Sequence, residues 1–214
     1  MSGKDRPAPP VAVAAEFVGS ASRADELPAS LAVEVAFAGR SNVGKSTLLN
    51  LLLGQRLAHT SSSPGRTRTL NFFSVKTRGG SVLSFVDLPG YGFARRAKEE
   101  KLAWADLAEQ YLLERPALAL VIVLVDARRG PEADDLDLLK MMKESKKGGR
   151  AAPQTMVVAT KLDKLPLAQR KPALAAIAKR GVRVVGVAAS DPASIADLWA
   201  RVLAGLGLER AQPA

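Results

Sequence analysis

The stretch Gly39-Arg40-Ser41-Asn42-Val43-Gly44-Lys45-Ser46-Thr47 decides the fold class of this 214-residue chain. Residues 39–46 match GxxxxGK[ST], a glycine-rich pattern whose backbone N–H groups surround the phosphates of a nucleotide. A strand-like apolar run precedes it at 33–38 and a helical pattern follows it at 45–53, which is the context that a phosphate-binding loop requires. Lys45 is placed to reach the β- and γ-phosphates, and Ser46 to bind Mg²⁺. The motif alone is shared by GTPases, ATPases and nucleotide kinases.

Strand and helix patterns alternate along the chain on both sides of this loop. The predicted strands are 33–38, 71–76, 82–87, 119–125, 155–159 and 182–187, and the predicted helices are 45–53, 99–113, 131–143, 166–180 and 193–206. This alternation predicts an α/β fold with a six-stranded, mostly parallel sheet and helices on both faces. A tight turn at Gly79-Gly80 makes one of the strands antiparallel.

The domain organisation follows from composition. Residues 1–12 are rich in Pro and Ala and are predicted to form a disordered N-terminal tail. We expect a single domain over 13–208 and a short C-terminal tail at 209–214.

Charge and hydropathy restrict the class of partner and the compartment. The net charge is +10, which favours RNA or ribonucleoprotein partners over a merely solvated surface. No apolar run approaches the ~20 residues that span a bilayer, so we expect no membrane insertion. The chain has no cysteine, and its charged, proline-rich N-terminus lacks the apolar core of a signal peptide. Both features fit a cytoplasmic protein.

The segment Thr160-Lys161-Leu162-Asp163 follows a buried strand and matches the [NT]KxD pattern that recognises guanine. The Asp163 carboxylate could accept hydrogen bonds from guanine N1–H and the 2-amino group, neither of which adenine offers. Acceptors left unpaired by adenine would penalise ATP by a few kcal/mol. The aliphatic stem of Lys161 could cover the base. The alternative is a surface ion pair in a loop.

Two segments between these motifs complete a Mg²⁺ site. Asp87-Leu88-Pro89-Gly90 fits DxxG, in which Asp87 would hold Mg²⁺ through water and the Gly90 N–H would face the γ-phosphate. An ordinary strand-to-loop turn is the alternative. In the loop Gly65-Arg66-Thr67-Arg68-Thr69, one Thr hydroxyl would close on Mg²⁺. The residues alone do not distinguish Thr67 from Thr69.

With these motifs in place, the chain resembles the EngB (YihA/YsxC) family of small Era-like bacterial GTPases. The resemblance runs from Glu16 to Trp199 and is most specific in 34–46, 64–73, 87–92 and 160–165. It implies the P-loop GTPase fold, binding of GTP or GDP with Mg²⁺, and a role in assembly of the large ribosomal subunit and in cell division and septation. It also favours Thr67 as the Mg²⁺ ligand.

One departure from the family concerns the guanine-binding loop. The family usually has Phe-Ser-Ser where this chain has Val187-Ala188-Ala189. In the family a backbone N–H meets guanine O6 and a Ser steadies the turn. Ala keeps the N–H but loses the hydroxyl, and Ser190 is a replacement shifted by one residue.

Hydrolysis is expected to be slow without a partner. Tyr91 occupies the position after DxxG where Ras-like proteins have the Gln that orients water. In related Era-like GTPases an Asn at the place of Asn42 helps to bind K⁺, and simple stabilisation of the loop is the alternative reading. For the arginines of the two switch loops we favour rRNA contact over an arginine finger. These arginines are Arg66, Arg68, Arg95 and Arg96.

The predicted site therefore has three groups of residues. The catalytic group is Lys45, Thr67, Gly90 and Asn42, and the Mg²⁺ ligands are Ser46, Thr67 and Asp87. The nucleotide-binding residues are Gly39, Arg40, Ser41, Asn42, Val43, Gly44, Lys45, Ser46, Thr47, Gly65, Arg66, Thr67, Arg68, Thr69, Asp87, Leu88, Pro89, Gly90, Thr160, Lys161, Leu162, Asp163, Val187, Ala188 and Ala189.

The function expected from this site is a monomeric GTPase switch that contacts the large ribosomal subunit or its precursor. The alternatives are a GTP-dependent protein-interaction switch at the division apparatus with negligible catalysis, and a P-loop ATPase or nucleotide kinase.

Overall fold

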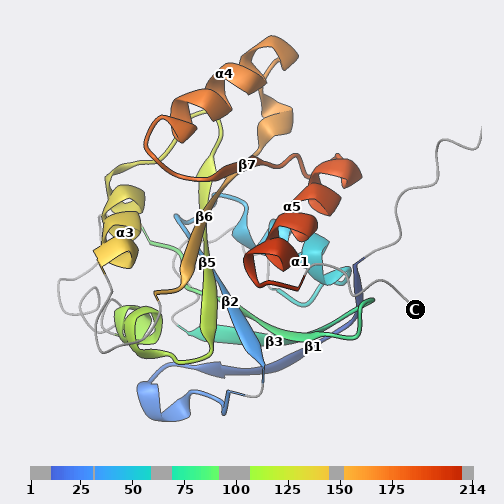
Figure 1. Ribbon diagram of the computed structural model, residues 1–214, viewed down its shortest axis with the longest axis vertical. Helices are drawn as coiled ribbons and strands as arrows, with labels where there is room; N and C mark the ends of the chain where they lie inside the picture. Colours follow the sequence, from blue (N-terminus) through green and yellow to red (C-terminus); the bar gives the residue numbers. More distant parts are fainter. Residues whose placement is uncertain (1–10, 31, 59–68, 92–106, 145–151, 209–214) are drawn as a thin grey trace, which may run out of the picture.

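The computed structural model describes residues 11–30, 32–58, 69–91, 107–144 and 152–208. They form one twisted sheet in the order β1-β3-β4-β2-β5-β6-β7, with helices on both faces (Figure 1). The strands are β1 (Ala12–Ala21), β2 (Val33–Gly39), β3 (Leu70–Thr77), β4 (Val82–Asp87), β5 (Leu118–Asp126), β6 (Gln154–Thr160) and β7 (Val184–Gly186). The helices are α1 (Lys45–Leu53), α3 (Ala133–Glu144), α4 (Leu167–Ala178) and α5 (Pro192–Gly205), with a further helical segment at 107–114 and short 3-10 turns at Ala24–Glu26 and Leu162–Lys164.

The fold class is confirmed, but the sheet has seven strands rather than six. The additional strand, β1, runs along the edge of the sheet and pairs antiparallel with β3, with irregularities between Ala12 and Ala14 and between Phe17 and Gly19. These irregularities break the alternation of apolar and polar residues on which a strand prediction depends. β1 also begins at Ala12, the last residue of the predicted N-terminal tail.

The prediction of one antiparallel strand is confirmed. β3 pairs antiparallel with both β1 and β4, whereas β4, β2, β5, β6 and β7 pair in parallel. Six strands therefore point the same way and β3 points the other way.

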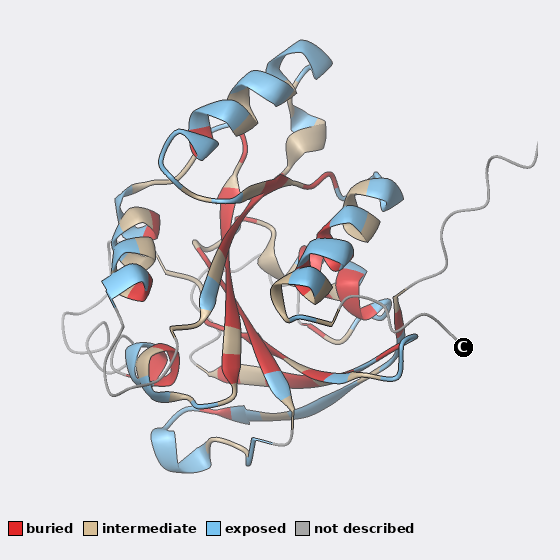
Figure 2. Ribbon diagram, in the orientation of Figure 1, coloured by how far each residue is buried: buried red, intermediate tan, exposed pale blue. Residues whose placement is uncertain are grey.

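The sheet separates two apolar layers (Figure 2). On one face α1 and α5 pack over sheet side chains such as Phe37 and Phe85, and the ring of Trp199 on α5 stacks on Phe85 with centroids 5.3 Å apart. On the other face the 107–114 segment and α3 cover sheet residues that include Phe72, and Tyr111 of that segment packs against the Phe72 ring. The strands between the layers are almost entirely buried, as expected for parallel strands with helices on both sides.

A buried polar cluster fixes the helical segment 107–114 to β2. The Glu34 carboxylate is 2% exposed and accepts hydrogen bonds from the Tyr111 hydroxyl (2.8 Å) and from Arg115 Nη2 (2.7 Å). Arg115 Nη2 also donates to the Pro28 carbonyl at 2.7 Å. The cluster satisfies a carboxylate that would otherwise be costly to bury.

This arrangement brings the predicted motifs to one edge of the sheet. Gly39, Asp87, Asp126 and Thr160 end neighbouring parallel strands, and Asp126 lies directly opposite Thr160 in the register. Ligands of open α/β sheets bind at this carboxyl edge.

Candidate nucleotide-binding site

The phosphate loop connects β2 to α1 and adopts a conformation that depends on its glycines. Gly44 has φ 104° and caps the N-terminus of α1, and Asn42 has φ 63°. A Cβ atom on Gly39 would lie 3.0 Å from the Leu124 carbonyl oxygen on β5. The first turn of α1 contains no acidic residue and its N-cap provides no side-chain hydrogen bond. The N–H groups at this helix end are therefore available to an anion.

The charged pair beside this loop consists of Lys45 and Asp87. The Lys45 ammonium group contacts the Asp87 carboxylate, and both side chains are almost fully buried. Burial raises the pKa of the Asp87 carboxyl, and the neighbouring Lys45 partly opposes this shift. The two residues thus place a cation and a carboxylate where β4 ends and α1 begins.

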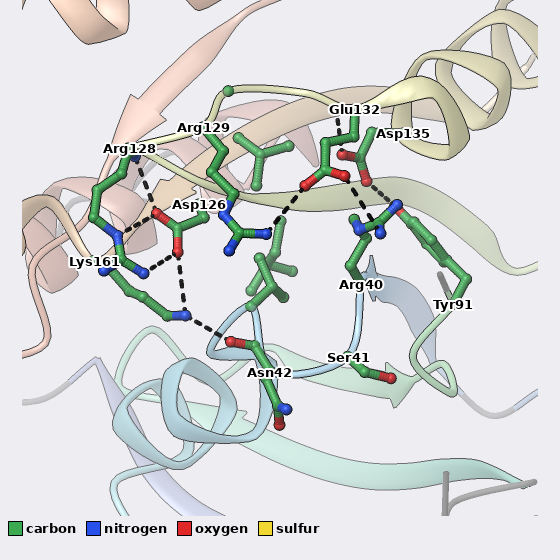
Figure 3. Close-up of a pocket in the computed structure, with 14 residues that line it drawn as sticks. Arg40, Ser41, Asn42, Tyr91, Asp126, Arg128, Arg129, Glu132, Asp135 and Lys161 are labelled. Atoms are coloured by element: carbon green, nitrogen blue, oxygen red, sulfur yellow. Dashed lines mark hydrogen bonds and ion pairs between the residues drawn. The ribbon is translucent and has the colours of Figure 1, made fainter. Parts of the chain in front are cut away.

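The TKLD segment is bonded directly to the phosphate loop. The buried Thr160 hydroxyl donates to the Val43 carbonyl at 2.6 Å. Lys161 Nζ donates to the Asn42 carbonyl at 2.6 Å and pairs with Asp126 at 3.2 Å (Figure 3). Lys161 itself adopts the left-handed backbone conformation, with φ 57°. The side chain of Lys161, which the sequence predicted to cover the base, therefore extends to the phosphate loop and bonds to it.

Asp126 and Arg128 were not among the predicted site residues. Arg128 donates to Asp126 from Nε (2.9 Å) and Nη2 (2.6 Å), and its backbone N–H donates to the same carboxylate at 3.0 Å. These bonds, together with Lys161, hold the pKa of Asp126 well below its usual range. The available signal was an Asp at the end of a buried strand, without the DxxG motif that identified Asp87.

Tyr91 is tied to α3 and to the phosphate loop. Its hydroxyl donates to Asp135 at 2.6 Å, and burial is the main cause of the raised pKa of Tyr91. The Ser41 N–H donates to the Tyr91 carbonyl at 3.0 Å, and the Tyr91 N–H donates to the Gly39 carbonyl at 3.3 Å. A Cβ atom on Gly90 would lie 2.8 Å from Ser41 Oγ. Residues 90 and 91 therefore lie directly against the phosphate loop.

A cavity of about 330 Å³ lies between the phosphate loop, the end of β5 and the start of α3 (Figure 3). Arg40 lines it and forms ion pairs with Asp134 (2.9 Å) and Glu132 (3.3 Å). These contacts give Arg40 carboxylate partners at the start of α3.

The two predicted base-binding loops lie side by side because β6 and β7 are neighbours. The Leu162 N–H donates to the Val187 carbonyl at 3.1 Å, and the Val187 N–H donates to the Ala159 carbonyl at 2.8 Å. The Asp163 side chain is 22% exposed and pairs with Lys164 at 3.4 Å.

Part of the predicted site lies outside the described residues. This holds for Gly65, Arg66, Thr67 and Arg68. The structure describes Thr69, whose hydroxyl bonds to Asn71 Oδ1 at 3.3 Å.

Residues 34–161 match the family described as a 50S ribosome-binding GTPase. A probable GTP-binding protein EngB from Anaeromyxobacter sp. (strain Fw109-5) is 40% identical over 202 residues, which cover 89% of this chain and 90% of the relative. The chain belongs to the EngB family of GTP-binding proteins. Another EngB relative, from Exiguobacterium sibiricum, is 44% identical over 170 residues, 78% of this chain and 81% of the relative. The resemblance read from the motifs is thereby confirmed, and the chain binds guanine nucleotide as a member of a GTPase family.

Solved structures agree on the fold. An Era variant from Aquifex aeolicus bound to GDP and AlF4⁻ has a TM-score of 0.68 and 26% identity, and the match covers 84% of this chain and 58% of the Era chain. A crystal structure of a probable GTP-binding protein EngB has a TM-score of 0.63 at 22% identity and covers 82% of this chain and 100% of that chain. Among the described residues, no helix is both long and apolar enough to cross a bilayer.

Proposed function

We propose that this EngB-family protein is a slow GTPase that acts as a switch in assembly of the large ribosomal subunit and supports normal cell division. It acts in the cytoplasm as a monomer, with one domain over 13–208. Two features support a ribosomal partner: the net charge of +10 and the family's description as ribosome-binding.

The places of the described groups at the carboxyl edge of the sheet support the roles proposed for them. The N–H groups of the phosphate loop and Lys45 bind the phosphates, and Asp163 with the backbone of Val187 to Ala189 selects guanine. The Gly90 N–H contacts the γ-phosphate, and the arginines of the switch loops contact rRNA.

Two residues of the donor set proposed for Mg²⁺ lie in the described part of the chain, Asp87 at the end of β4 and Ser46 in the first turn of α1. Ser46, Thr67 and Asp87 would hold the ion together with the nucleotide phosphates, since Mg²⁺ is commonly held by one or two carboxylates plus substrate phosphates. The described residues contain no group of three or more His, Cys, Asp or Glu side chains that could hold a metal. Bound Mg²⁺ supplies positive charge that offsets the charge developing on the phosphates.

The observation that carries the proposal of slow hydrolysis is the position of Tyr91. Its hydroxyl is committed to Asp135 at 2.6 Å on α3, and a phenol offers no amide to orient water. The chain alone therefore lacks, at this position, the group that Ras-like proteins use. We expect single-turnover hydrolysis of GTP to be slow for the isolated protein and at least tenfold faster with large ribosomal subunits. Equal rates with and without subunits would contradict this switch mechanism.

Sedimentation tests the partner directly. We expect the protein with a non-hydrolysable GTP analogue to co-sediment with the large subunit, and the GDP-bound protein to do so less. Charge reversal at Arg95 and Arg96 should weaken co-sedimentation and leave GDP affinity unchanged. If subunit binding is the same in both nucleotide states, or insensitive to these charges, a protein partner at the division apparatus becomes the better explanation.

Asn42 supports a second component of catalysis, a K⁺ ion near the phosphates. Lys161 contacts only the backbone carbonyl of Asn42, and the Asn42 side chain is exposed. In the described part of the chain no hydrogen bond holds this side chain to the loop, which supports the K⁺ hypothesis. We expect faster hydrolysis in KCl than in NaCl at matched ionic strength, and a loss of this difference in Asn42→Ala. Equal rates in the two salts would remove K⁺ from the mechanism.

A further inference from the structure

The turn that follows β7 carries no polar side chain at Ala188 or Ala189, the two predicted base-binding positions after Val187. Ala188 and Ala189 stand where the resemblance expects two Ser residues. The Asp191 N–H donates to the Ala188 carbonyl at 3.0 Å and closes a turn around residues 189–190. Something other than the side chains of the two alanines must hold this turn in one conformation.

Ser194, in the first turn of α5, supplies the missing hydroxyl. Its Oγ accepts the Ala188 N–H at 3.2 Å and lies 2.7 Å from the Asp191 carbonyl and 3.1 Å from the Ala188 carbonyl. A hydroxyl has one proton and two acceptor lone pairs, so it can accept from Ala188 and donate to a carbonyl at the same time. One side chain therefore connects both ends of the turn.

These contacts differ from helix capping. Asp191 is the N-cap of α5 and its carboxylate accepts the Ala193 N–H at 3.0 Å. In a capping box, the side chain three residues after the N-cap would accept the N-cap N–H. Here that N–H goes to the Ala188 carbonyl, and Ser194 reaches past the N-cap to the Ala188 N–H. The hydroxyl thus serves the loop before the helix.

The same contacts determine which N–H groups remain for a ligand. The Val187 and Ala188 N–H groups are bonded to Ala159 and Ser194. Within the described residues, the N–H of Ala189 makes no hydrogen bond. Ser190, the replacement that the sequence suggested, is exposed, and its hydroxyl makes no hydrogen bond to the described part of the chain.

We propose that Ser194 is a positioning residue for guanine: its hydroxyl holds the Ala188–Asp191 turn so that the Ala189 N–H meets O6 of the base. This inference rests on the proposed roles of Asp163 and the Val187–Ala189 loop. Ser194 acts through the backbone of the turn and does not itself touch the nucleotide. The loop and α5 follow one another directly along the chain (Figure 1), so the support is local and independent of the phosphate loop.

Ser194→Ala tests this inference in the full-length protein. Loss of one neutral hydrogen bond predicts about fivefold weaker GDP binding by titration calorimetry. The rate of single-turnover hydrolysis at saturating GTP should stay at the wild-type value, because the phosphate contacts are unchanged. Ser194→Thr keeps the hydroxyl and should restore GDP affinity. Ser190→Ala, in the same turn, is the matched control and should bind GDP as wild type does.

Nucleotides that lack single groups of the base identify the contact. Inosine diphosphate keeps O6 and lacks the 2-amino group, whereas 2-aminopurine riboside diphosphate keeps the amino group and lacks O6. Ser194→Ala should weaken binding of GDP and inosine diphosphate by the same factor and leave binding of the 2-aminopurine nucleotide unchanged. Unchanged GDP affinity, or an equal loss for all three nucleotides, would overturn the proposal.

The outcome also separates this inference from the proposed base contacts. Asp163→Asn should weaken GDP binding but affect inosine diphosphate less, since inosine keeps N1–H and lacks the 2-amino group, one of the two donors to Asp163. If Asp163→Asn shows this pattern and Ser194→Ala does not weaken GDP binding, only the role of Ser194 is wrong. If Asp163→Asn leaves GDP affinity intact, the predicted base contacts themselves are wrong.

Discussion

Replacing Tyr91 by Phe removes one buried hydroxyl and leaves the ring in place. The hydroxyl donates to Asp135 at 2.6 Å, and this carboxylate is in a residue that is only 1% exposed. Asp135 keeps the Glu132 N–H at 2.8 Å, so the carboxylate is not left without a partner. The loss is therefore that of one hydrogen bond to a charged group, about 1.5–3 kcal/mol of unfolding free energy. At about 2–4 °C per kcal/mol for a chain of this size, Tm should fall by about 3–12 °C.

The unfolding free energy that Tyr91→Phe loses should depend on pH. Burial raises the pKa of Asp135, and the Tyr91 hydrogen bond lowers it. A carboxyl group whose pKa is higher in the folded than in the unfolded state contributes stability below its unfolded pKa of about 3.9. That contribution is lost as the pH rises through the folded pKa. Removing the phenol raises the folded pKa further, so the deficit of Tyr91→Phe should be larger at pH 7 than at pH 4.

The assay is urea or thermal unfolding at both pH values, together with single-turnover GTP hydrolysis. Tyr111→Phe is the matched control, because it also removes a hydroxyl from a buried carboxylate, Glu34, at 2.8 Å but lies away from the phosphate loop. Both variants should be less stable, and neither should hydrolyse GTP more slowly than wild type. The reasoning is refuted if Tyr91→Phe is as stable as wild type at pH 7, or if it alone loses hydrolysis.

Other predictions follow from individual contacts. Gly90→Ala places a Cβ against the backbone of the phosphate loop and should cost about 1–3 kcal/mol in urea unfolding, whereas Gly19→Ala, with no atom within 4 Å of the new Cβ, should be close to neutral. Arg128→Met removes the main cause of the lowered pKa of Asp126. Because this pKa is lower in the folded than in the unfolded state, the Asp126 carboxylate stabilises the fold above its unfolded pKa, and this contribution is lost as the pH falls through the folded pKa. The acid-unfolding midpoint of this variant should therefore move to higher pH, and an unchanged midpoint would contradict the assignment. Lys45→Met should weaken GDP binding by about 10- to 100-fold in titration calorimetry, and a smaller loss would argue against a phosphate contact.

Much of the architecture could be predicted because each motif and the strand or helix pattern beside it indicate the same fold. The apolar run before Gly39 and the helix after Lys45 fix the place of the phosphate loop, and the long buried strands β5 and β6 are evident from their apolar residues. Asp87 and Thr160 end parallel strands, so their convergence follows from topology alone.

Features that depend on tertiary pairing could not be predicted in this way. β1 contains Gly19 and several Ala residues and is held by its backbone pairing with β3, which no local pattern encodes. The Lys161–Asp126 and Ser194–Ala188 contacts join residues whose side chains are common in loops and at helix starts. Only the folded chain shows that they meet, since a lone Ser or Asp carries no information about its partner.

The short length of β7 has a consequence for nucleotide release. β7 has three residues and, within the described ranges, pairs with β6 alone, whereas β2 pairs along its length with both β4 and β5. The loop proposed to bind the base therefore extends from the shortest strand, and the loop proposed to bind the phosphates extends from the middle of the sheet. Local opening of β7 needs fewer broken hydrogen bonds than opening of β2, so its amides should exchange with deuterium first. Guanine is thus expected to detach before the phosphates do, and release begins at the edge of the molecule.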